Sequence, residues 1–413
     1  MARRSSREVF QAFPRGEFVG RMLLLVTTLL VTFGTIAVAS ASEGQAAANG
    51  GTTWSIVTRD LIYLGFGLFA LYVVARVRLD FLVRRAPLWI MATLGLLLAV
   101  KAAGVTSNGG KRWLNLHAIY LQPSEIFKLA TVLYVAWLVQ DHHAELNHWK
   151  RLALWASPVA LGGALIVIEP DIGTSSIVFA LAFVMLAVAG LSRELLVRIV
   201  VLGAVGFGGY MLYKPYSARR FFAFLHPSQH LLGSGYQLQQ SKIGLGAGGL
   251  TGLGLGHGRE KWGLLPNPHT DFIFTVIGEE LGFIGCLLVL ALFVWFLLVA
   301  MRVAQQAPNP VHRLVAVGIA TWITLEAVIN IASVVGGWAV TGIPLPFFSY
   351  GGTALITELA AVGLLYNIAH DRSTGARGTL STSSPVGVDL IRHAPAPGRY
   401  SDHRSTHGSR RLR

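Results

Sequence analysis

The sequence has little charge and almost no cysteine. Only 13% of its 413 residues are charged and 53% are hydrophobic, whereas soluble domains carry about a quarter charged residues. An ordinary soluble enzyme is therefore not expected. Disorder over most of the chain is excluded because disorder requires low hydrophobicity. The single cysteine, Cys286, rules out an intramolecular disulfide and a cysteine-based metal cluster.

Acidic residues are also scarce, since 34 Lys and Arg stand against 20 Asp and Glu, for a formal net charge of +14. This basic excess does not indicate a nucleic-acid partner, because the chain has no module in which basic and aromatic residues alternate as in nucleic-acid binding. Membrane proteins distribute positive charge according to topology instead.

Long apolar runs recur from residue 20 to residue 370. A membrane span needs about 20 apolar residues, so the fold class predicted is an all-α polytopic membrane protein with about ten transmembrane helices. The predicted spans are 20–41, 54–75, 87–104, 122–140, 152–168, 172–191, 195–214, 271–301, 313–336 and 351–370.

The loops between these spans differ in charge. Loops 42–53, 169–171 and 337–350 contain no Lys or Arg, whereas the N-terminal segment and the alternate loops are basic. The positive-inside rule then places both termini in the cytoplasm. Three regions follow: a basic N-terminal segment (1–19), a membrane domain (20–370) and a basic tail (371–413) predicted to be disordered. The tail is expected to contact anionic lipid or a partner.

Two predicted external loops break this charge pattern. Loop 101–121 contains Lys111 and Arg112, and the large loop 215–270 between the seventh and eighth spans contains Arg219, Arg220 and Lys242. These cations are expected to contact either lipid phosphates or an anionic substrate at the outer membrane face. The glycine-rich stretch 244–258 is not interpreted as a nucleotide site, since no βαβ unit surrounds it. Its glycines favour close backbone packing or anion binding by main-chain N–H groups.

Asp271 is the principal acidic candidate. It follows two prolines and opens the eighth span, so we expect it in the first helical turn, capped by His269 or Thr270, at the water interface. It serves either as a helix-dipole carboxylate or in catalysis.

Other charged residues lie at or inside the predicted spans. Glu125 and Lys128 are three residues apart and are expected to pair along one helix face, where they are either a structural ion pair or the polar floor of an external cavity. Glu169 and Asp171 flank Pro170 and either bind a cation or cap the sixth span. Trp113 is either an interfacial aromatic or a platform for a sugar face. Structural pairing is expected for the mid-span carboxylates Glu326 and Glu358, and at least one of the adjacent Glu279 and Glu280 is expected to face a basic residue or a wet cavity.

The chain resembles the SEDS family, which comprises the FtsW, RodA and SpoVE proteins of bacterial division, elongation and sporulation. The resemblance is carried by motifs in the same order over most of 20–370. They are Gly110-Lys-Arg-Trp-Leu-Asn-Leu116, Gln122-Pro-Ser-Glu-Ile-Phe-Lys-Leu129, Glu169-Pro-Asp-Ile-Gly-Thr174, Gly233-Ser-Gly-Tyr-Gln237, Gln240-Ser-Lys-Ile243, the stretch 265–282 around Pro-His-Thr-Asp271, and Ile343-Pro-Leu-Pro-Phe-Phe-Ser-Tyr-Gly-Gly352. Two departures, Asn267-Pro268 before His269 and Thr353-Ala354 after Gly352, leave Asp271 in place.

The resemblance implies a peptidoglycan glycosyltransferase that polymerises lipid II, the undecaprenyl-pyrophosphate-linked disaccharide-pentapeptide, at the outer face of the bacterial cytoplasmic membrane. It implies a class B penicillin-binding protein as partner, Asp271 as the catalytic aspartate, and functional roles for Trp113, Glu125, Lys128 and Asp171. Two motifs, 235–237 and 277–281, are more similar to the division branch than to the elongation branch.

These features together suggest an inverting transfer in which Asp271 is the general base. The leaving pyrophosphate would be stabilised by the external cations Lys111, Arg112, Arg219, Arg220 and Lys242. A divalent cation, magnesium or manganese, is a further candidate for that task, although the sequence contains no closed set of metal ligands. Two alternatives remain open, a lipid II flippase and a non-catalytic scaffold for the penicillin-binding protein. A flippase would show a polar cytoplasmic lining and internal repeats, and a scaffold would tolerate loss of Asp271.

Overall fold

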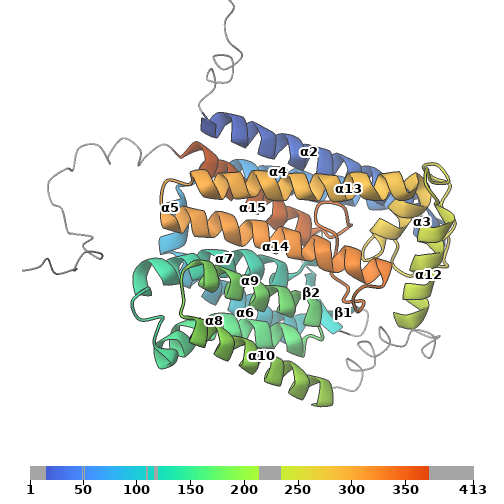
Figure 1. Ribbon diagram of the computed structural model, residues 1–413. Helices are drawn as coiled ribbons and strands as arrows, with labels where there is room; N and C mark the ends of the chain where they lie inside the picture. The colour runs from blue at the N-terminus through green and yellow to red at the C-terminus, as the bar shows by residue number, and fades with distance from the viewer. Residues whose placement is uncertain are drawn as a thin grey trace, which may run out of the picture. The chain divides into compact units, whose positions relative to one another are not determined.

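The computed structural model describes residues 15–48, 50, 52–107, 110–115, 120–213 and 234–371. Its helices and strands follow one another along the chain (Figure 1). They are α2 (Arg15–Ala41), α3 (Glu43–Ala48), α4 (Thr53–Val74), α5 (Leu79–Arg84), α6 (Ala86–Ala103), β1 (Val105–Ser107), β2 (Gly110–Asn115), β3 (Tyr120–Leu121), α7 (Pro123–His142), α8 (Trp149–Ile168), α9 (Ile172–Val188), α10 (Arg193–Tyr213), α12 (Ser234–Ala247), α13 (Ile273–Gln306), α14 (Pro310–Val335) and α15 (Thr353–His370).

The predicted all-α membrane fold is confirmed. Each of the ten predicted spans corresponds to one helix of the described chain, and α2 begins at Arg15, before the predicted start of the first span. Eight of these helices are long and apolar enough to cross a membrane. The ninth, α9, is apolar but has only 17 residues, and the tenth, α7, carries Glu125 and Lys128. The protein is therefore multi-pass, and the number of ten crossings stays a prediction.

The connecting segments gather at the two ends of the helices. At one end, which we call the α12 end, lie α3, α12, the strands and the loop between α14 and α15 (Figure 1). Contacts across this end join Glu43 to Lys261, and Arg112 to Glu169. At the opposite end, Asp80 of α5 contacts His312 at the start of α14. All the loops predicted to be external have their described parts at the α12 end, so the predicted alternation of the spans agrees with the structure.

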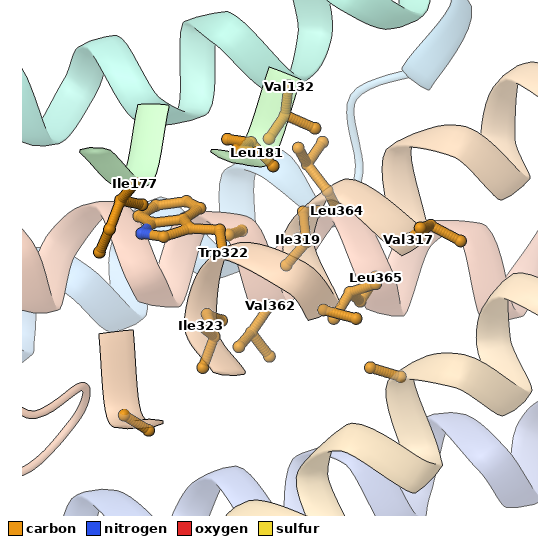
Figure 2. Close-up of a cluster of buried hydrophobic side chains, with 14 of the residues drawn as sticks. Val132, Ile177, Leu181, Val317, Ile319, Trp322, Ile323, Val362, Leu364 and Leu365 are labelled. Carbon is orange, nitrogen blue, oxygen red and sulfur yellow. The ribbon is translucent and has the colours of Figure 1, made fainter. Parts of the chain in front are cut away.

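The hydrophobic core lies where α7, α9, α14 and α15 meet (Figure 2). Trp322 of α14 is fully buried there, and its ring lies near Ile177 and Leu181 of α9. Within the most apolar windows, 67% of α14 and 72% of α15 are buried, against 6% of α10. A helix that is apolar on all sides is expected inside a membrane protein. The central helix α14 is therefore a rigid support, whereas α10 presents its side chains outward.

Local sequence explains both ends of α14. The Asn309 side chain accepts a hydrogen bond from the His312 N–H at 2.8 Å, and Pro310 occupies the first turn. Proline is favoured there because its missing N–H would have no helical partner. At the other end, Gly336 adopts a left-handed conformation with φ of 85°, which glycine tolerates without steric cost.

Two predicted external loops contain structure that the sequence analysis did not predict. Loop 101–121 includes a small three-stranded antiparallel sheet in the order β1-β2-β3. The predicted loop 215–270 includes the 14-residue helix α12, and residues 214–233 lie outside the described part. Helix α12 does not form a long apolar run, because it contains Gln237, Gln239 and Gln240 among its apolar residues.

The glycine-rich stretch packs backbone to backbone against a break in α13. Gly282 has φ of 68° and ψ of −165°, so α13 consists of two helices joined at this residue. The carbonyls of Glu279 and Glu280 accept hydrogen bonds from the N–H groups of Leu253 and Gly254, both at 3.0 Å. The carbonyl groups that lose their helical partners at the break are thus hydrogen-bonded, as buried backbone groups must be. These glycines therefore allow close backbone packing, which was one of the two functions predicted for them, the other being anion binding.

We predict that Gly248→Ala destabilises the protein. A Cβ at Gly248 would lie 1.9 Å from the carbonyl oxygen of Gly278, so the glycine-rich stretch would have to move away from α13. Overpacking of this kind costs about 1–3 kcal/mol, which would be measured as a lower thermal unfolding midpoint in detergent. The matched control is Gly246→Ala, where nothing lies within 4 Å. Equal midpoints for the two variants would contradict this packing.

Candidate active site

Asp271 lies in a turn at the α12 end, directly before α13. The first helical residue is Ile273 and the N-cap is Phe272, which makes no side-chain capping hydrogen bond. The prediction that Asp271 sits in the first helical turn, with His269 or Thr270 as the cap, is therefore wrong. The reason is that the preceding residues are held elsewhere: the Thr270 carbonyl accepts from Ser349 Oγ at 2.6 Å, and the His269 carbonyl accepts from the Tyr350 N–H at 2.9 Å.

Loop 337–352, between α14 and α15, folds back against this turn. Its buried apolar side chains include Ala339, Val340, Ile343, Leu345, Phe347 and Phe348. The Asn330 side chain of α14 donates to the main-chain carbonyl of Asp271 at 2.9 Å and to that of Ile343 at 2.8 Å. The loop and the Asp271 turn are thus joined through one buried amide.

The α8–α9 turn reaches the other side of the same loop. A Cβ at Gly173, in the first turn of α9, would lie 2.7 Å from Ile343 Cγ1 and 3.0 Å from Thr341 Cβ. A Cβ at Gly342 would lie 3.6 Å from Asp271 Oδ2. Residues 341–343 therefore lie between Asp271 and the start of α9, so tertiary structure brings two of the motif segments to one place.

Arg112 and Asp171 hold the α8–α9 turn in shape. The Arg112 guanidinium donates to the carbonyls of Glu169 and Pro170, and it lies 3.8 Å from the Asp171 carboxylate. Asp171 is the N-cap of α9, where its Oδ1 accepts from the Thr174 N–H at 3.2 Å. Asp171 therefore caps the helix, which was one of the two functions predicted for it, the other being cation binding. Substrate-binding roles for Arg112 and Asp171 stay predictions.

Glu169 is the unpaired member of this turn. Its side chain is 6% exposed, and neither carboxylate oxygen has a hydrogen-bond partner in the described chain. Burial, with a smaller contribution from the Asp171 carboxylate, raises the pKa of Glu169 to about 8. The carboxyl group is therefore mostly protonated at neutral pH, as expected for a buried acid whose loss of solvent outweighs the attraction of the nearby Arg112 guanidinium.

We predict that Glu169→Gln is tolerated and removes a pH dependence of stability. Because the folded-state pKa is raised, the wild type is most stable below the unfolded pKa near 4.5 and loses stability as pH rises through about 8. A neutral amide cannot lose a proton, so the difference in unfolding midpoint between variant and wild type should increase from pH 5 to pH 9. Asp171→Ala is the control, and it should destabilise at both pH 5 and pH 9 because it removes the side-chain cap of α9. An identical pH profile for Glu169→Gln and wild type would refute the assignment.

Glu125 and Lys128 form the predicted pair on α7. Lys128 Nζ lies 2.7 Å from Glu125 Oε2 and also contacts Glu326 of α14. All three side chains are about 1% exposed, so the group is a buried ion-pair cluster. Glu358 of α15 accepts from the Phe347 N–H at 2.8 Å. The structural partners expected for Glu326 and Glu358 are confirmed, and substrate contact by Glu125 and Lys128 stays a prediction.

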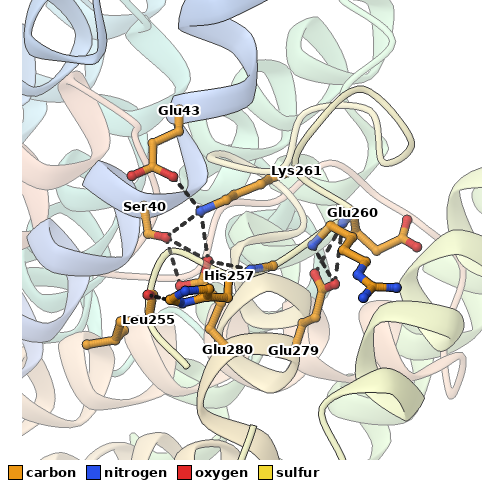
Figure 3. A network of polar contacts seen from close by, with 10 residues as sticks. Ser40, Glu43, Leu255, His257, Glu260, Lys261, Glu279 and Glu280 are labelled. Carbon is orange, nitrogen blue, oxygen red and sulfur yellow. Dashed lines mark hydrogen bonds and ion pairs between the residues drawn. The ribbon is translucent and has the colours of Figure 1, made fainter. Parts of the chain in front are cut away.

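A second buried network fixes the segment before Asp271 (Figure 3). Lys261 Nζ contacts Glu280 at 3.0 Å and Glu43 at 2.6 Å, and Ser40 Oγ bridges to both carboxylate oxygens of Glu280 at 2.7 Å. The Arg259 N–H donates to Glu279 at 2.7 Å. The expectation that at least one of Glu279 and Glu280 faces a basic residue is therefore confirmed.

The remaining predicted site residues are more exposed. Lys111 is exposed and Trp113 half-buried on β2. Lys242 is exposed on α12 and lies beside Gly336, where a Cβ would meet its Nζ at 2.7 Å. Arg219 and Arg220 lie outside the described residues. Among the residues that are described, no group of three or more His, Cys, Asp and Glu side chains is arranged to hold a metal ion.

Several buried polar atoms on the segments that meet at this end have no partner within the described chain. They are His269 Nδ1, Asn330 Oδ1, Thr341 Oγ1 and the Glu169 carboxylate oxygens. Burial lowers the pKa of His269 to about 4, so its ring is neutral at pH 7. Buried polar atoms are normally hydrogen-bonded to protein or to ordered water, so these atoms are available to water or to a polar ligand. Asn330 was not among the predicted site residues, although an asparagine inside an apolar span is a signal of function.

Comparisons with known proteins agree with these motifs. Residues 20–374 match the family FTSW_RODA_SPOVE, described as cell cycle protein. The chain belongs to this family. It is 37% identical over 355 residues to the stage V sporulation protein E of Bacillus subtilis, covering 84% of this chain and 96% of that protein. It is also 37% identical over 354 residues to the probable peptidoglycan glycosyltransferase FtsW of Trichlorobacter lovleyi, covering 84% and 92%.

Solved structures of the FtsW/RodA/SpoVE family extend the comparison. One chain from work on the structural coordination of polymerization and crosslinking by a peptidoglycan synthase complex is 29% identical, with a TM-score of 0.72, and covers 85% of this chain and 97% of its own. The rod shape determining protein RodA of Thermus thermophilus is 26% identical, with a TM-score of 0.63, and covers 85% and 96%. The fold of this chain is thus the polytopic membrane fold of the family.

Proposed function

We propose that this protein polymerises lipid II into β-1,4 glycan strands. Cell-wall glycosyl transfer is the activity that the family and its relatives named peptidoglycan glycosyltransferase support. The observation that carries the specific proposal is the position of Asp271. This carboxylate lies in a turn against which loop 337–352 packs, and the same loop contacts the start of α9.

Asp271 would act as the general base. An α-linked donor and a β-linked product require inversion, so a single displacement with one base suffices. In this scheme the 4-hydroxyl of the acceptor GlcNAc attacks the donor's anomeric carbon. Its proton passes to an Asp271 oxygen, and the bond to undecaprenyl pyrophosphate breaks with the electron pair leaving on phosphate oxygen. General-base catalysis of this kind contributes about 10²–10⁴ in rate.

Cations at the α12 end would stabilise the departing pyrophosphate. The candidates in the described chain are Lys111 and Lys242, which are exposed, and Arg112, which is half-buried. Arg219 and Arg220 are further candidates from the predicted external loop. Preorganised positive charge lowers the barrier where negative charge develops. Trp113 is placed on β2 beside Arg112, where its ring would pack against a sugar face.

A divalent cation, magnesium or manganese, is proposed to accompany the pyrophosphate. The described chain provides no convergent group of three acidic or histidine side chains, so such a cation would be bound chiefly through the phosphate oxygens of the substrate. Hard divalent cations commonly bind in this way, with few protein ligands.

The proposed setting is the bacterial cytoplasmic membrane, with the α12 end outside and a class B penicillin-binding protein as partner. The charge asymmetry of the loops supports this orientation, since loops 42–53, 169–171 and 337–350 have no Lys or Arg. The similarity to a chain from a peptidoglycan synthase complex supports the partnership. Both a sporulation protein and division proteins are among the relatives, so the cellular process is left open.

The test is polymerisation of labelled lipid II by the purified full-length protein, with and without its class B penicillin-binding partner. Long glycan strands from the wild type, and none from Asp271→Asn, are expected. A protein that makes no strands with its partner present, but moves lipid II across vesicle membranes, would be a flippase. A protein that makes no strands and moves no lipid, but activates the transpeptidase, would be a scaffold.

A further inference from the structure

Asn330 is a buried polar side chain that joins the Asp271 turn to loop 337–352 by two hydrogen bonds. It lies on α14 and is 2% exposed. Its Nδ2 donates to the main-chain carbonyl of Asp271 at 2.9 Å and to that of Ile343 at 2.8 Å. Asp271 and Ile343 are 59 and 13 residues away from Asn330 in the sequence. The two hydrogen bonds therefore form only in the folded protein.

The orientation of this amide is determined by chemistry. Both partners are carbonyl oxygens, which only accept hydrogen bonds, so only the NH₂ group of Asn330 can face them. Both of its N–H donors are thereby used. The other amide atom, Oδ1, is buried and has no partner within the described chain. The contribution of this side chain to the protein therefore resides in its two donors.

The residues that Asn330 joins have no regular structure of their own. Asp271 precedes the first residue of α13, and Ile343 lies in a loop of sixteen residues numbered 337–352. Gly342, adjacent to Ile343, approaches the Asp271 carboxylate so closely that a Cβ there would lie 3.6 Å from Oδ2. In contrast, α14 is deeply buried and regular over 26 residues. A rigid helix thus sets the spacing between two irregular segments.

We propose that Asn330 is a positioning residue, which holds the Asp271 main chain against residues 341–343 so that the Asp271 carboxylate faces the reacting hydroxyl. This inference rests on the proposed function, in which Asp271 is the base. A displacement of about 1 Å in a reacting group can cost about 10²-fold in rate. Substrate affinity depends on many other contacts and is expected to change little.

The test compares two substitutions at Asn330 with one at Ser333. Asn330→Leu removes both donors. Asn330→Asp keeps the shape. As a buried acid that faces two carbonyl oxygens it keeps its proton and one donor at low pH, and it gains a negative charge near Asp271 only as it ionises at higher pH. Ser333→Ala is the matched control, because Ser333 lies almost one turn further along α14. Its Oγ donates to the carbonyl of Ile329 on α14 at 2.7 Å and to that of Ala339 on the same loop at 2.9 Å.

Lipid II polymerisation is measured with the full-length protein and its partner as a function of lipid II concentration and pH. Asn330→Leu should lower kcat by about 100-fold with KM within about threefold of wild type. Asn330→Asp should lower kcat least at low pH and progressively more as pH rises, because ionisation removes its remaining donor and sets a carboxylate against two carbonyl oxygens. Ser333→Ala should keep both the wild-type kcat, within about threefold, and the wild-type pH profile.

The titratable groups on the segments that pack around this part of the α12 end are common to variant and wild type. They are His269 on the same turn, Glu169, Asp171 and Arg112 at the α8–α9 turn, Tyr350 on the loop, and Lys242 on α12. The measured quantity is therefore the ratio of the variant kcat to the wild-type kcat at each pH.

Two results would overturn the inference. One is a kcat for both Asn330 variants equal to that of Ser333→Ala. The other is a kcat of Asn330→Asp that is reduced by the same factor at every pH, which would indicate general structural damage. If Asn330→Leu does not fold, Asn330→Asp decides alone. Failure of the proposed function itself gives different results, namely no strands from wild type or full activity of Asp271→Asn.

Discussion

Replacing Asp271 by asparagine is expected to lower the rate of lipid II polymerisation by about 10²–10⁴-fold. The amide has nearly the same size and can keep the position of the turn, because Ser349 and Asn330 bond the main chain of residues 270 and 271 and not the carboxylate. It cannot accept the proton of the attacking hydroxyl. The rate of strand formation by purified protein with its partner, resolved by length on a gel, measures the effect.

The control for Asp271→Asn is Asp141→Asn. Asp141 is exposed near the end of α7, away from the α12 end, so its loss should leave polymerisation unchanged. Binding of the partner protein and the thermal unfolding midpoint should be the same for both variants and wild type. Full polymerisation by Asp271→Asn would refute its assignment as the base and direct the search to Glu125 and Asp171.

Replacing Lys128 by methionine is expected to cost about 3–5 kcal/mol of unfolding free energy. Lys128 is the cation of a cluster in which Glu125 and Glu326 both contact its ammonium group, at about 1% exposure. Removing it leaves carboxylates in an apolar core without a counter-charge, which is far more costly than losing an exposed pair. The measurement is denaturant or thermal unfolding of the detergent-solubilised protein.

The Lys128 prediction has a compensating variant as its internal check. Adding Glu125→Gln and Glu326→Gln to Lys128→Met removes the unpaired charges and should recover most of the lost stability, since replacing a whole buried ion cluster is often neutral. Lys150→Met is the matched surface control, because Lys150 is exposed. The charge explanation would be refuted by a triple variant less stable than Lys128→Met alone.

Local sequence was sufficient for the framework of the protein. Each predicted span is a helix because about 20 apolar residues in succession satisfy their own backbone hydrogen bonds as a helix. The Glu125–Lys128 pair was predictable because residues three apart share a helix face. The tight connection at 169–171 was predictable because Pro170 and two carboxylates interrupt the apolar pattern.

Predictions failed where a segment's structure depends on distant residues. Asp271 was assigned to the first turn of its helix, yet contacts from Ser349 and Tyr350 hold the preceding residues outside it. The break in α13 at Gly282 could not be predicted from an apolar sequence, because it is stabilised by the glycine-rich stretch about thirty residues earlier. The short strands and α12 were not predicted, because none of them has the run of about 20 apolar residues that a membrane span needs.

The sequence by itself determined that this is a polytopic membrane protein of the FtsW/RodA/SpoVE family with an aspartate, Asp271, in its most specific motif. Hydropathy and motif order carry that information, because both are properties of contiguous residues. Only the tertiary structure decided which groups meet: Asn330 with Asp271 and Ile343, Lys261 with Glu280, and Lys128 with Glu326. Such pairs join residues that are far apart in sequence, and they form because each buried polar group must find a partner among the helices packed around it.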